Sequence, residues 1–282
     1  MHDTLTAALD DFAASSPILI ALDFDGCLAP FEQDPANSRP LPESSAALAR
    51  LGADPGVQLA LVSGRPAADL LTLATPSAGT WLVGSHGGQT GEVRADGTLH
   101  LDPFELTTAQ AELRSAVADA LAELAAAYPG AWVENKPAAA ALHTRGLSAE
   151  AADEALDAAM AGPGGWPGVH PIRGNQVAEL AVLEVTKGQA LERLRARLLG
   201  GPPAAPREVS EPGEATSAVG PRVLYAGDDV TDETALATLR DGDVGVKVGD
   251  APTVAGHRVP DERAVARMLT HLADRRATQI TP

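Results

Sequence analysis

Short apolar runs alternate with stretches of helical spacing through the first hundred residues. The runs are too short for helices, and the apolar residues between them recur every three or four positions. The same alternation returns after residue 187, which indicates βαβ units and one parallel sheet that is split in sequence. The predicted strands are residues 18–22, 57–62, 81–83, 223–226 and 244–248, and the predicted helices are residues 44–51, 67–73, 188–199 and 234–240.

The middle of the chain has a different pattern. Apolar residues at 113, 117, 121 and 124 predict a helix, and two extended segments, 131–136 and 138–145, follow it. A second helix begins after Ser148, a plausible N-cap. We therefore predict an α/β fold with a doubly wound, Rossmann-like parallel-sheet core (1–105 and 179–282) and an inserted smaller α/β domain (106–178). Residues 200–221, rich in Pro, Gly and Ala without periodicity, predict a surface excursion.

Charge and cysteine content narrow the classes of partner. The 38 acidic and 21 basic residues of the 282-residue chain give a net charge of −17. This charge repels nucleic acid and anionic membranes, and it favours divalent cations. Cys27 is the only cysteine, so no internal disulfide forms. With no basic, apolar leader and no run long enough to span a bilayer, we expect a cytoplasmic protein, and no obligate protein partner is implied.

Two carboxylates, Asp23 and Asp25, follow the first predicted strand and precede Gly26. Ligands bind open α/β sheets at the carboxyl ends of strands, so this position suits chemistry. Adjacent side chains on a strand point to opposite faces, and residues two apart diverge once the strand ends, which suits a nucleophile and a separate general acid/base. An ordinary acidic turn is the alternative explanation.

Two further polar sites open predicted helices. Ser63, Gly64 and Arg65 follow the second strand and offer a hydroxyl, a flexible backbone and a guanidinium, which are phosphate-binding groups. Lys187 stands at the head of the helix that follows it. A helix cap at Ser63 and a solvated lysine are the structural alternatives.

A dense acidic cluster follows the strand at residues 223–226. Gly227 leads into Asp228 and Asp229, and Asp232 and Glu233 follow. The positive end of a helix favours the last two acids, but Asp228 and Asp229 repel each other unless a cation lies between them. Mg²⁺, which is held by a few carboxylates, water and substrate phosphate, fits that need.

The order of these sites, acid pair, serine, lysine, acid pair, resembles the haloacid-dehalogenase-like phosphatases. The resemblance implies that Asp23 is the nucleophile, Asp25 the general acid/base, and Ser63 and Lys187 ligands of the phosphate, with Gly64 and Arg65 beside it. It also implies that Asp23, the Asp25 carbonyl and Asp228 bind Mg²⁺, with Asp229 in support. The implied metal ligands are therefore Asp23, Asp25, Asp228 and Asp229. Cys27 replaces a threonine that is common in that family.

Within the inserted domain, the segments Glu134-Asn135-Lys136 and His143-Thr144-Arg145 resemble the cap of trehalose-6-phosphate phosphatases. Gly84-Ser85-His86-Gly87, Glu179 upstream of Lys187, and the segment from Gly227 to Glu233 are similar to other motifs of that family. The resemblance implies a cap that closes on a sugar phosphate, a small-molecule substrate, and residues that bind its hydroxyls: Glu134, Lys136, Arg145 and Glu179. Gln89 departs from the usual glutamate of that family, and Glu179 lacks the basic residue and proline that often follow it. For an isolated hairpin, a cross-strand salt bridge explains the same charges.

Trehalose 6-phosphate is therefore the expected substrate, hydrolysed through an aspartyl phosphate. A phosphatase for a sucrose or glucosylglycerol phosphate would share the core and differ in cap contacts. A sugar-phosphate sensor without activity is the alternative from another class, although it has no need of Asp23, Asp25, Lys187 and Asp228 together. A phosphomutase would retain the phosphoryl group instead of releasing it.

Overall fold

The computed structural model describes residues 3–103, 106–183, 185–200 and 220–279. These residues form two compact units, which we treat separately. The described part of the larger unit comprises residues 3–102, 185–200 and 220–279, and that of the smaller unit comprises residues 103 and 106–183.

An eight-stranded sheet forms the centre of the larger unit, in the order β12-β11-β10-β1-β2-β3-β4-β5. The strands from β12 to β3 are parallel, and β4 and β5 are antiparallel additions at one edge. The strands are β1 (Ile18–Leu22), β2 (Val57–Val62), β3 (Trp81–Gly84), β4 (Gln89–Val93), β5 (Leu99–Leu101), β10 (Arg222–Gly227), β11 (Val244–Val248) and β12 (His257–Val259).

The order of the strands reverses beside β1. All five residues of β1 are apolar and buried, as a central parallel strand covered on both faces requires. β1 pairs with β2 on one side and with β10 on the other, although these two strands are far apart in sequence. The carboxyl ends of β1, β2 and β10 therefore surround a topological switch point, where open α/β sheets bind ligands.

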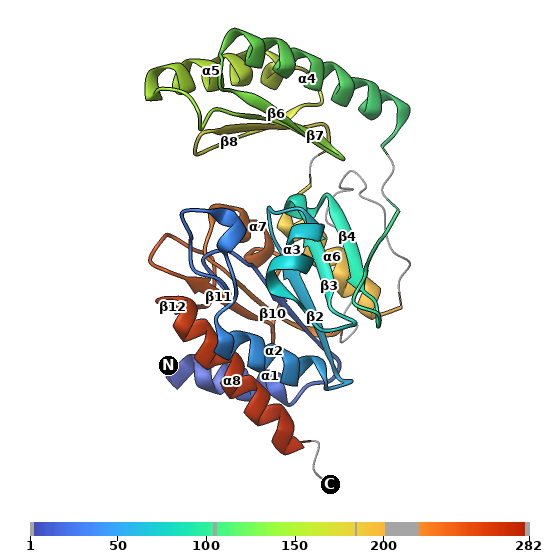
Figure 1. The fold of residues 1–282 in the computed structure, drawn as a ribbon. Coiled ribbons are helices and arrows are strands. Elements are labelled where there is room, and N and C mark those ends of the chain that lie inside the picture. Colours follow the sequence, from blue (N-terminus) through green and yellow to red (C-terminus); the bar gives the residue numbers. More distant parts are fainter. Residues whose placement is uncertain (1–2, 104–105, 184, 201–219, 280–282) are drawn as a thin grey trace. The chain divides into compact units, whose positions relative to one another are not determined.

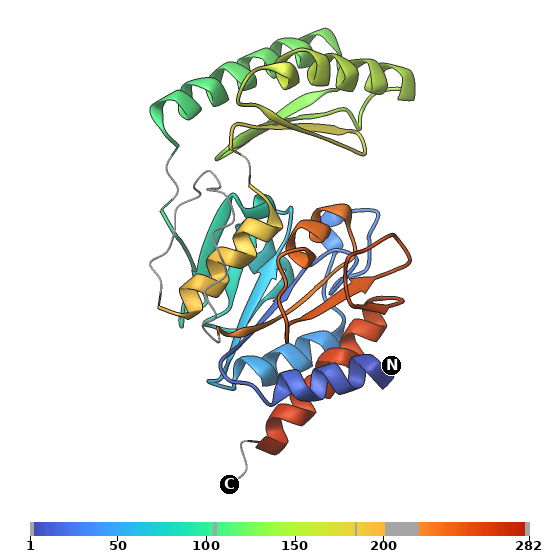
Figure 2. The ribbon, with the colours of Figure 1, turned by 180° about the vertical axis from the view of Figure 1, so that it is seen from behind.

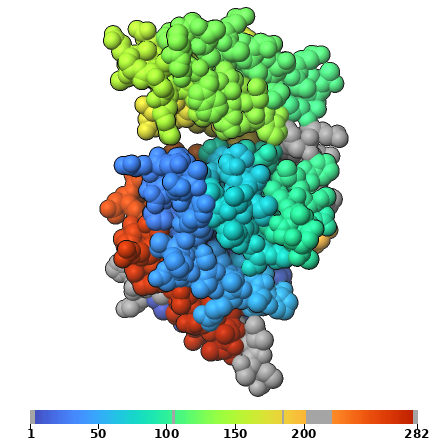
Figure 3. Space-filling view, in the orientation of Figure 1, coloured from blue at the N-terminus to red at the C-terminus, as the bar shows by residue number. Residues whose placement is uncertain are grey.

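Helices cover both faces of this sheet (Figures 1 and 2). One apolar cluster joins the sheet to α1, α2, α3 and α8, and a second joins it to α6 and α7. In the space-filling view, α2 and α8 pack side by side on one face of the larger unit (Figure 3). The helices are α1 (Asp3–Ala13), α2 (Pro42–Gly52), α3 (Ala67–Ala74), α6 (Lys187–Leu198), α7 (Glu233–Leu236) and α8 (Glu262–Gln279), so α7 is shorter than the predicted helix at 234–240.

The smaller unit is a four-stranded antiparallel sheet with two helices on one face (Figure 1). Its apolar cluster includes Val117 and Leu121 from one helix and Leu142 and Leu180 from the sheet. Ser148 caps the second helix, as predicted: its side chain accepts a hydrogen bond from the Ala151 amide. The order of the strands is β6-β7-β9-β8, and the elements are α4 (Thr108–Ala127), β6 (Trp132–Lys136), β7 (Ala139–His143), α5 (Ala149–Ala161), β8 (His170–Gly174) and β9 (Val177–Ala181).

The predicted fold class, a doubly wound α/β core with an inserted α/β domain, is confirmed. The domain boundary that we placed between residues 178 and 179 falls inside β9. This strand pairs with β7 and β8, so Glu179 belongs to the sheet of the smaller unit. Residues 201–219 of the predicted excursion lie outside the described residues. Within the described part of the chain, no helix combines the length and apolar character of a membrane span.

Candidate active site

Asp23 lies at the carboxyl end of β1, at the switch point. Its backbone amide donates to the Ala226 carbonyl, which extends the pairing of β1 and β10 by one residue (2.9 Å). The Phe24 amide donates to Asp23 Oδ1 at 2.7 Å, so the carboxylate is fixed by the backbone that follows it. Only 5% of Asp23 is exposed. The sequence thus places a nearly buried, oriented carboxylate where β1 ends.

Gly26 permits Asp23 and Asp228 to approach each other. Its φ of +72° is unfavourable for residues with a side chain, and a Cβ atom there would lie 2.3 Å from Asp228 Oδ2. Gly227 is under the same constraint, because a Cβ atom there would lie 2.2 Å from Asp232 Cγ. Each glycine therefore leaves space for a carboxylate that belongs to the site.

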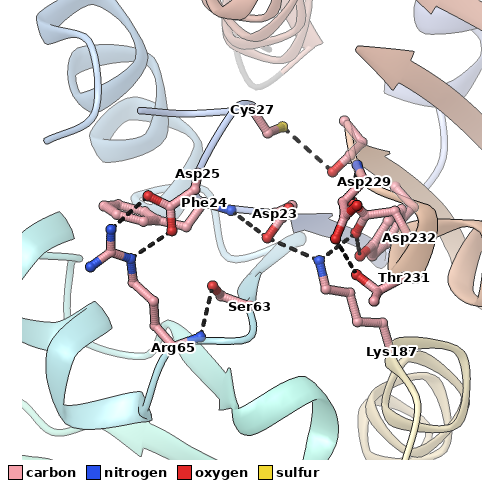
Figure 4. A network of polar contacts seen from close by, with 12 residues as sticks. Asp23, Phe24, Asp25, Cys27, Ser63, Arg65, Lys187, Asp229, Thr231 and Asp232 are labelled. Atoms are coloured by element: carbon pink, nitrogen blue, oxygen red, sulfur yellow. Dashed lines mark hydrogen bonds and ion pairs between the residues drawn. The ribbon is translucent and has the colours of Figure 1, made fainter. Parts of the chain in front are cut away.

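Lys187, the first residue of α6, is buried among acidic side chains (Figure 4). Its Nζ atom lies 2.7 Å from Asp232 Oδ1 and 3.1 Å from Asp23 Oδ1. Asp232 also accepts hydrogen bonds from the Tyr225 hydroxyl at 2.6 Å and from the Asp229 amide at 2.9 Å. The alternative that Lys187 is a solvated surface lysine is therefore wrong: it is 2% exposed and faces the nucleophile candidate.

Burial and charge shift the protonation of this cluster. Burial raises the pKa of Asp23 well above its ordinary value, and the positive charge of Lys187 opposes this effect only in part. Burial and the charge of Asp232 raise the pKa of Asp228 to about 6. Burial alone would lower the pKa of Lys187, but the charges of Asp23 and Asp232 outweigh it and raise this pKa. Lys187 therefore stays positively charged. The charge of Lys187 alone does not offset the burial and mutual repulsion of the carboxylates.

The acidic cluster fits a divalent cation. Carboxylate oxygens of Asp23, Asp228 and Asp232 lie within 4.8 Å of one another. Crowded carboxylates with raised pKa values are stabilised when a cation takes the place of the proton, and oxygen ligands suit Mg²⁺. Because three donors already occupy Asp232, Asp23 and Asp228 are the better ligands.

Asp229 lines the same cavity as Asp228, and its side chain is bound by the turn that follows β10. Its carboxylate accepts hydrogen bonds from the Val230 amide at 2.7 Å and from the Thr231 hydroxyl at 3.3 Å. It therefore caps the short 3₁₀ turn Val230–Asp232. The structure brings Asp232, instead of Asp229, beside Asp23 and Asp228, and direct support of a metal by Asp229 stays a prediction.

The Ser63-Gly64-Arg65 loop is held by the segment that follows β3. The Ser85 amide donates to the Arg65 carbonyl, and the His86 amide donates to the Ser63 carbonyl. A Cβ atom on Gly64 would lie 2.6 Å from the His86 ring, so this position requires glycine. The Ser63 hydroxyl accepts from the Arg65 amide at 3.2 Å and does not cap α3.

Arg65 binds Asp25. Its Nε atom donates to Asp25 Oδ2 at 2.6 Å, and Nη2 donates to Asp25 Oδ1 at 2.7 Å (Figure 4). The guanidinium also donates to the Pro35 carbonyl and the Ser38 hydroxyl. This two-point contact fixes the orientation of the predicted acid/base. In this structure Arg65 therefore contacts the acid/base candidate, whereas our sequence prediction placed it on the substrate.

These groups share one cavity of about 400 Å³ in the larger unit. A cavity of about 680 Å³ lies on α2 and α8, but it contains none of the predicted site residues. The smaller cavity is lined by Asp23, Asp25, Phe31, Ser63, Gly64, Arg65, His86, Lys187, Asp228, Asp229 and Thr231.

The predicted sugar-binding residues lie in the smaller unit. Lys136 Nζ donates to Glu179 Oε2 at 2.5 Å, across the sheet from β6 to β9. Glu134 lies 2.9 Å from the His143 ring nitrogen Nε2. Arg145 follows β7 and is exposed. Three of the four residues are thus in the sheet, and two of them pair directly.

The sequence did not reveal the supporting roles of two residues, Asp232 and Lys247. Asp232 was interpreted as a helix N-terminal acid, yet it orients Lys187 and Tyr225. Lys247 is 1% exposed, and its Nζ atom lies 3.1 Å from both the Asp229 carbonyl and Glu233 Oε1. A lysine within the apolar run of β11 was the available signal.

Cys27 is a neutral, buried thiol. Burial raises its pKa well above the ordinary value, and the negative charge of Asp23 adds to this effect. The thiol donates to the Ala226 carbonyl at 3.5 Å, so it supports the loop at the contact between β1 and β10. A threonine hydroxyl could make the same contact more strongly.

Comparisons with known proteins agree on one family. A family model described as trehalose-phosphatase matches residues 21–262. A trehalose-phosphate phosphatase of Mycolicibacterium paratuberculosis is 30% identical over 98% of this chain and 64% of that protein. An uncharacterized glycosyl hydrolase of Mycobacterium tuberculosis is 32% identical over 90% of this chain and 18% of that protein. The chain thus spans less than two thirds of the length of these relatives.

The fold agrees with solved structures as well. The C-terminal domain of a Candida albicans trehalose-6-phosphate phosphatase superposes with a TM-score of 0.72 and 23% identity, over 96% of both chains. At this identity the likeness concerns the fold alone. The match of the family model over most of the sequence shows that the chain belongs to the trehalose-phosphatase family.

Proposed function

We propose that this protein is a Mg²⁺-dependent phosphohydrolase that converts trehalose 6-phosphate to trehalose and phosphate. The observation that carries the proposal is the cavity in which Asp23, Asp25, Ser63, Lys187 and Asp228 converge. Family membership supports the choice of substrate.

In the first half-reaction, a carboxylate oxygen of Asp23 attacks phosphorus, and the bond between phosphorus and the sugar oxygen breaks. The fixed charge of Lys187, 3.1 Å from Asp23, offsets repulsion between the carboxylate and the phosphate. The Ser63 hydroxyl is available for a phosphate oxygen. Asp25 donates a proton to the departing sugar oxygen.

In the second half-reaction, Asp25 takes a proton from water, which attacks the aspartyl phosphate. The bond between Asp23 and phosphorus breaks, and phosphate leaves. Asp23 and Asp228, with the Asp25 carbonyl, would hold Mg²⁺, which neutralises phosphate charge when bound. The bridge from Arg65 presents Asp25 as an acceptor, so this bridge must loosen before Asp25 donates a proton.

In this proposal, residues of the smaller unit determine the specificity for the sugar. We propose that Glu134, Lys136, Arg145 and Glu179 hydrogen-bond the sugar hydroxyls, each of which donates and accepts. The pair Lys136–Glu179 joins a cation to a carboxylate on one sheet face, so the two together offer both donors and acceptors. As residues 201–219 lie outside the described residues, we assign them no function.

The replacement Asp23→Asn tests the nucleophile. It preserves shape and removes the attacking oxygen's charge, so we expect phosphate release to fall by at least about 10³-fold, in the range of losses seen for activated nucleophiles. Asp241→Asn, an exposed acid with the same change of charge, is the control. Phosphate release by Asp23→Asn at the wild-type rate would contradict the mechanism.

A sugar-phosphate sensor is the alternative from another class. A sensor needs the sugar-binding groups but no nucleophile, and here Asp23 is buried, oriented and paired with Lys187. Binding of trehalose 6-phosphate without phosphate release, at saturating Mg²⁺, would favour the sensor over the enzyme.

A further inference from the structure

The four-stranded sheet of the smaller unit has one face without helices. The side chains of Leu142, Ala178 and Leu180 lie in the apolar cluster with α4 and α5. Side chains alternate along a strand, so residues of the other parity point to the opposite face. The strand register pairs Trp132 with His143, Glu134 with Ala141, and Ala141 with Glu179. All of these residues therefore lie on the face without helices.

Trp132 forms a rigid aromatic surface on this face. Its ring stacks on the His143 ring, with centroids 4.0 Å apart and an angle of 5° between the ring planes. His143 is held in turn by Glu134, whose Oε2 atom lies 2.9 Å from Nε2. Despite this contact, 52% of Trp132 is exposed. The contact with His143 therefore fixes the orientation of the indole, and the rest of its surface is exposed to solvent.

A single exposed aromatic residue is ordinary, and it needs no function by itself. Here three further observations distinguish the position. Trp132 is two residues from Glu134 on the same strand face, or about 6–7 Å along the strand. His143 links the two side chains directly. Ile172, in register with Glu179, adds a second apolar side chain that is 41% exposed on the same face.

A pyranose ring has a matching chemistry. Its C–H face is apolar and stacks on aromatic rings, whereas its hydroxyls require donors and acceptors at the rim. On this face the indole supplies the apolar surface, and Glu134, Lys136 and Glu179 supply the polar groups. Neither group alone recognises a sugar as well as the two together.

We infer that Trp132 is a sugar-stacking residue that determines specificity, and that His143 positions it. This inference rests on the proposed function, because it concerns the sugar of the same substrate. It assigns roles to two residues that the sequence motifs left without one. His143, between an indole and a carboxylate, couples the stacking surface to the hydrogen-bonding groups.

The test compares Trp132→Ala and Trp132→Phe with the wild type in the full chain. We expect the KM for trehalose 6-phosphate to rise roughly 10-fold in Trp132→Ala with a smaller change in kcat, and Trp132→Phe to recover most of the loss. Trp166→Ala is the matched control, since Trp166 is 36% exposed in the same unit and lies outside the sheet. The rate of phosphate release from a small aryl phosphate should change much less in the Trp132 variants.

A binding measurement separates stacking from stability. In an Asp23→Asn background, calorimetry with trehalose should show affinity reduced about 10-fold by Trp132→Ala and unchanged by Trp166→Ala. If the wild type hydrolyses trehalose 6-phosphate and Trp132→Ala matches it in KM and affinity, the stacking role is wrong and the proposed function stands. If the wild type neither hydrolyses the ester nor binds trehalose, both fail.

Discussion

At the scale of single residues, Arg65 and Asp25 show how the structure refines a role taken from a motif. Arg65 directs two N–H groups at the Asp25 carboxylate, so we propose that it acts on the reaction by orienting Asp25. A residue that binds substrate phosphate would act mainly on KM. A residue that positions the acid/base would act mainly on kcat.

We therefore expect Arg65→Lys to lower kcat about 10- to 100-fold with little change in KM, because lysine cannot form the two-point contact. Steady-state phosphate release over a range of substrate concentrations measures both constants. Arg39→Lys, an exposed arginine of the same region, is the control. A rise in KM with unchanged kcat would instead place Arg65 on the substrate.

Asp228 gives a prediction about pH. Burial and the charge of Asp232 raise its pKa in the folded protein from the ordinary 3.8 to about 6. The folded state thus holds this proton more tightly than the unfolded state does, and it loses stability as pH rises from about 4 through 6. A cation bound beside Asp228 would restore that stability at neutral pH.

In the presence of chelator, Asp228→Asn should therefore melt several degrees above the wild type at pH 7.5, and the difference should shrink towards pH 5. Added Mg²⁺ should raise the melting temperature of the wild type more than that of the variant. Asp241→Asn has the same net charge and controls for general repulsion. If Asp228→Asn in chelator is less stable than the wild type at pH 7.5, the negative charge of Asp228 does not destabilise the folded protein, and this account is wrong.

At the scale of elements, the contacts of Gln89 show why glutamine can stand where the family usually has glutamate. Its side-chain oxygen accepts a hydrogen bond from the Ala67 amide at 2.9 Å, at the beginning of α3. The N-cap residue of this helix, Pro66, provides no side-chain bond. Glutamate and glutamine both supply the required acceptor, so the change keeps this contact.

Gln89→Leu should lower the free energy of unfolding by about 1–2 kcal/mol, because it leaves a helix N-terminal amide without its acceptor. Gln89→Glu should stay close to the wild type, since it keeps the acceptor and places a negative charge at the helix N-terminus. Denaturant unfolding measures both. Equal stability of Gln89→Leu and the wild type would mean that this bond is not needed.

Much of the core could be predicted because its strands are continuous apolar runs. The predicted strands at 18–22, 57–62 and 244–248 coincide with β1, β2 and β11. α8 was not predicted, although Val265, Met268, Leu269 and Leu272 have helical spacing and are buried. The boundary within β9 was missed because a short strand takes its partner from the tertiary fold.

The site was predictable only in part, for a physical reason. Asp23 and Lys187 can be identified because they stand at the end of a strand and at the start of a helix. The role of Asp232 depends on contacts with Lys187, 45 positions away, and with Tyr225, and local pattern does not reveal such contacts. Likewise, the stacking of Trp132 on His143 follows from the strand register.

At the scale of the whole molecule, the residues proposed for chemistry and those proposed for specificity belong to two units, each with its own apolar core. The residues proposed for phosphoryl transfer belong to the larger unit, and those proposed for the sugar belong to the smaller one. A net charge of −17 makes retention of a cation beside the carboxylates easier than that of an anion. Loss of the sugar-binding groups should therefore spare the chemistry on simple esters.

Glu134→Ala applies this separation to a single residue. It should impair release from trehalose 6-phosphate at least about 10-fold, as expected when a charged hydrogen-bonding group is lost, and should affect a small aryl phosphate far less. Glu154→Ala, an exposed acid on α5, is the control. Equal losses on both esters would remove Glu134 from sugar recognition.

The most direct test of the proposed reaction is to measure phosphate release from a panel of esters. The panel contains trehalose 6-phosphate, glucose 6-phosphate, sucrose 6-phosphate and an aryl phosphate, each with Mg²⁺ and with chelator. We expect Mg²⁺-dependent release that strongly favours trehalose 6-phosphate. Preference for another ester would overturn the substrate and keep the chemistry, and no release from any ester would contradict the proposal that the protein is a phosphatase.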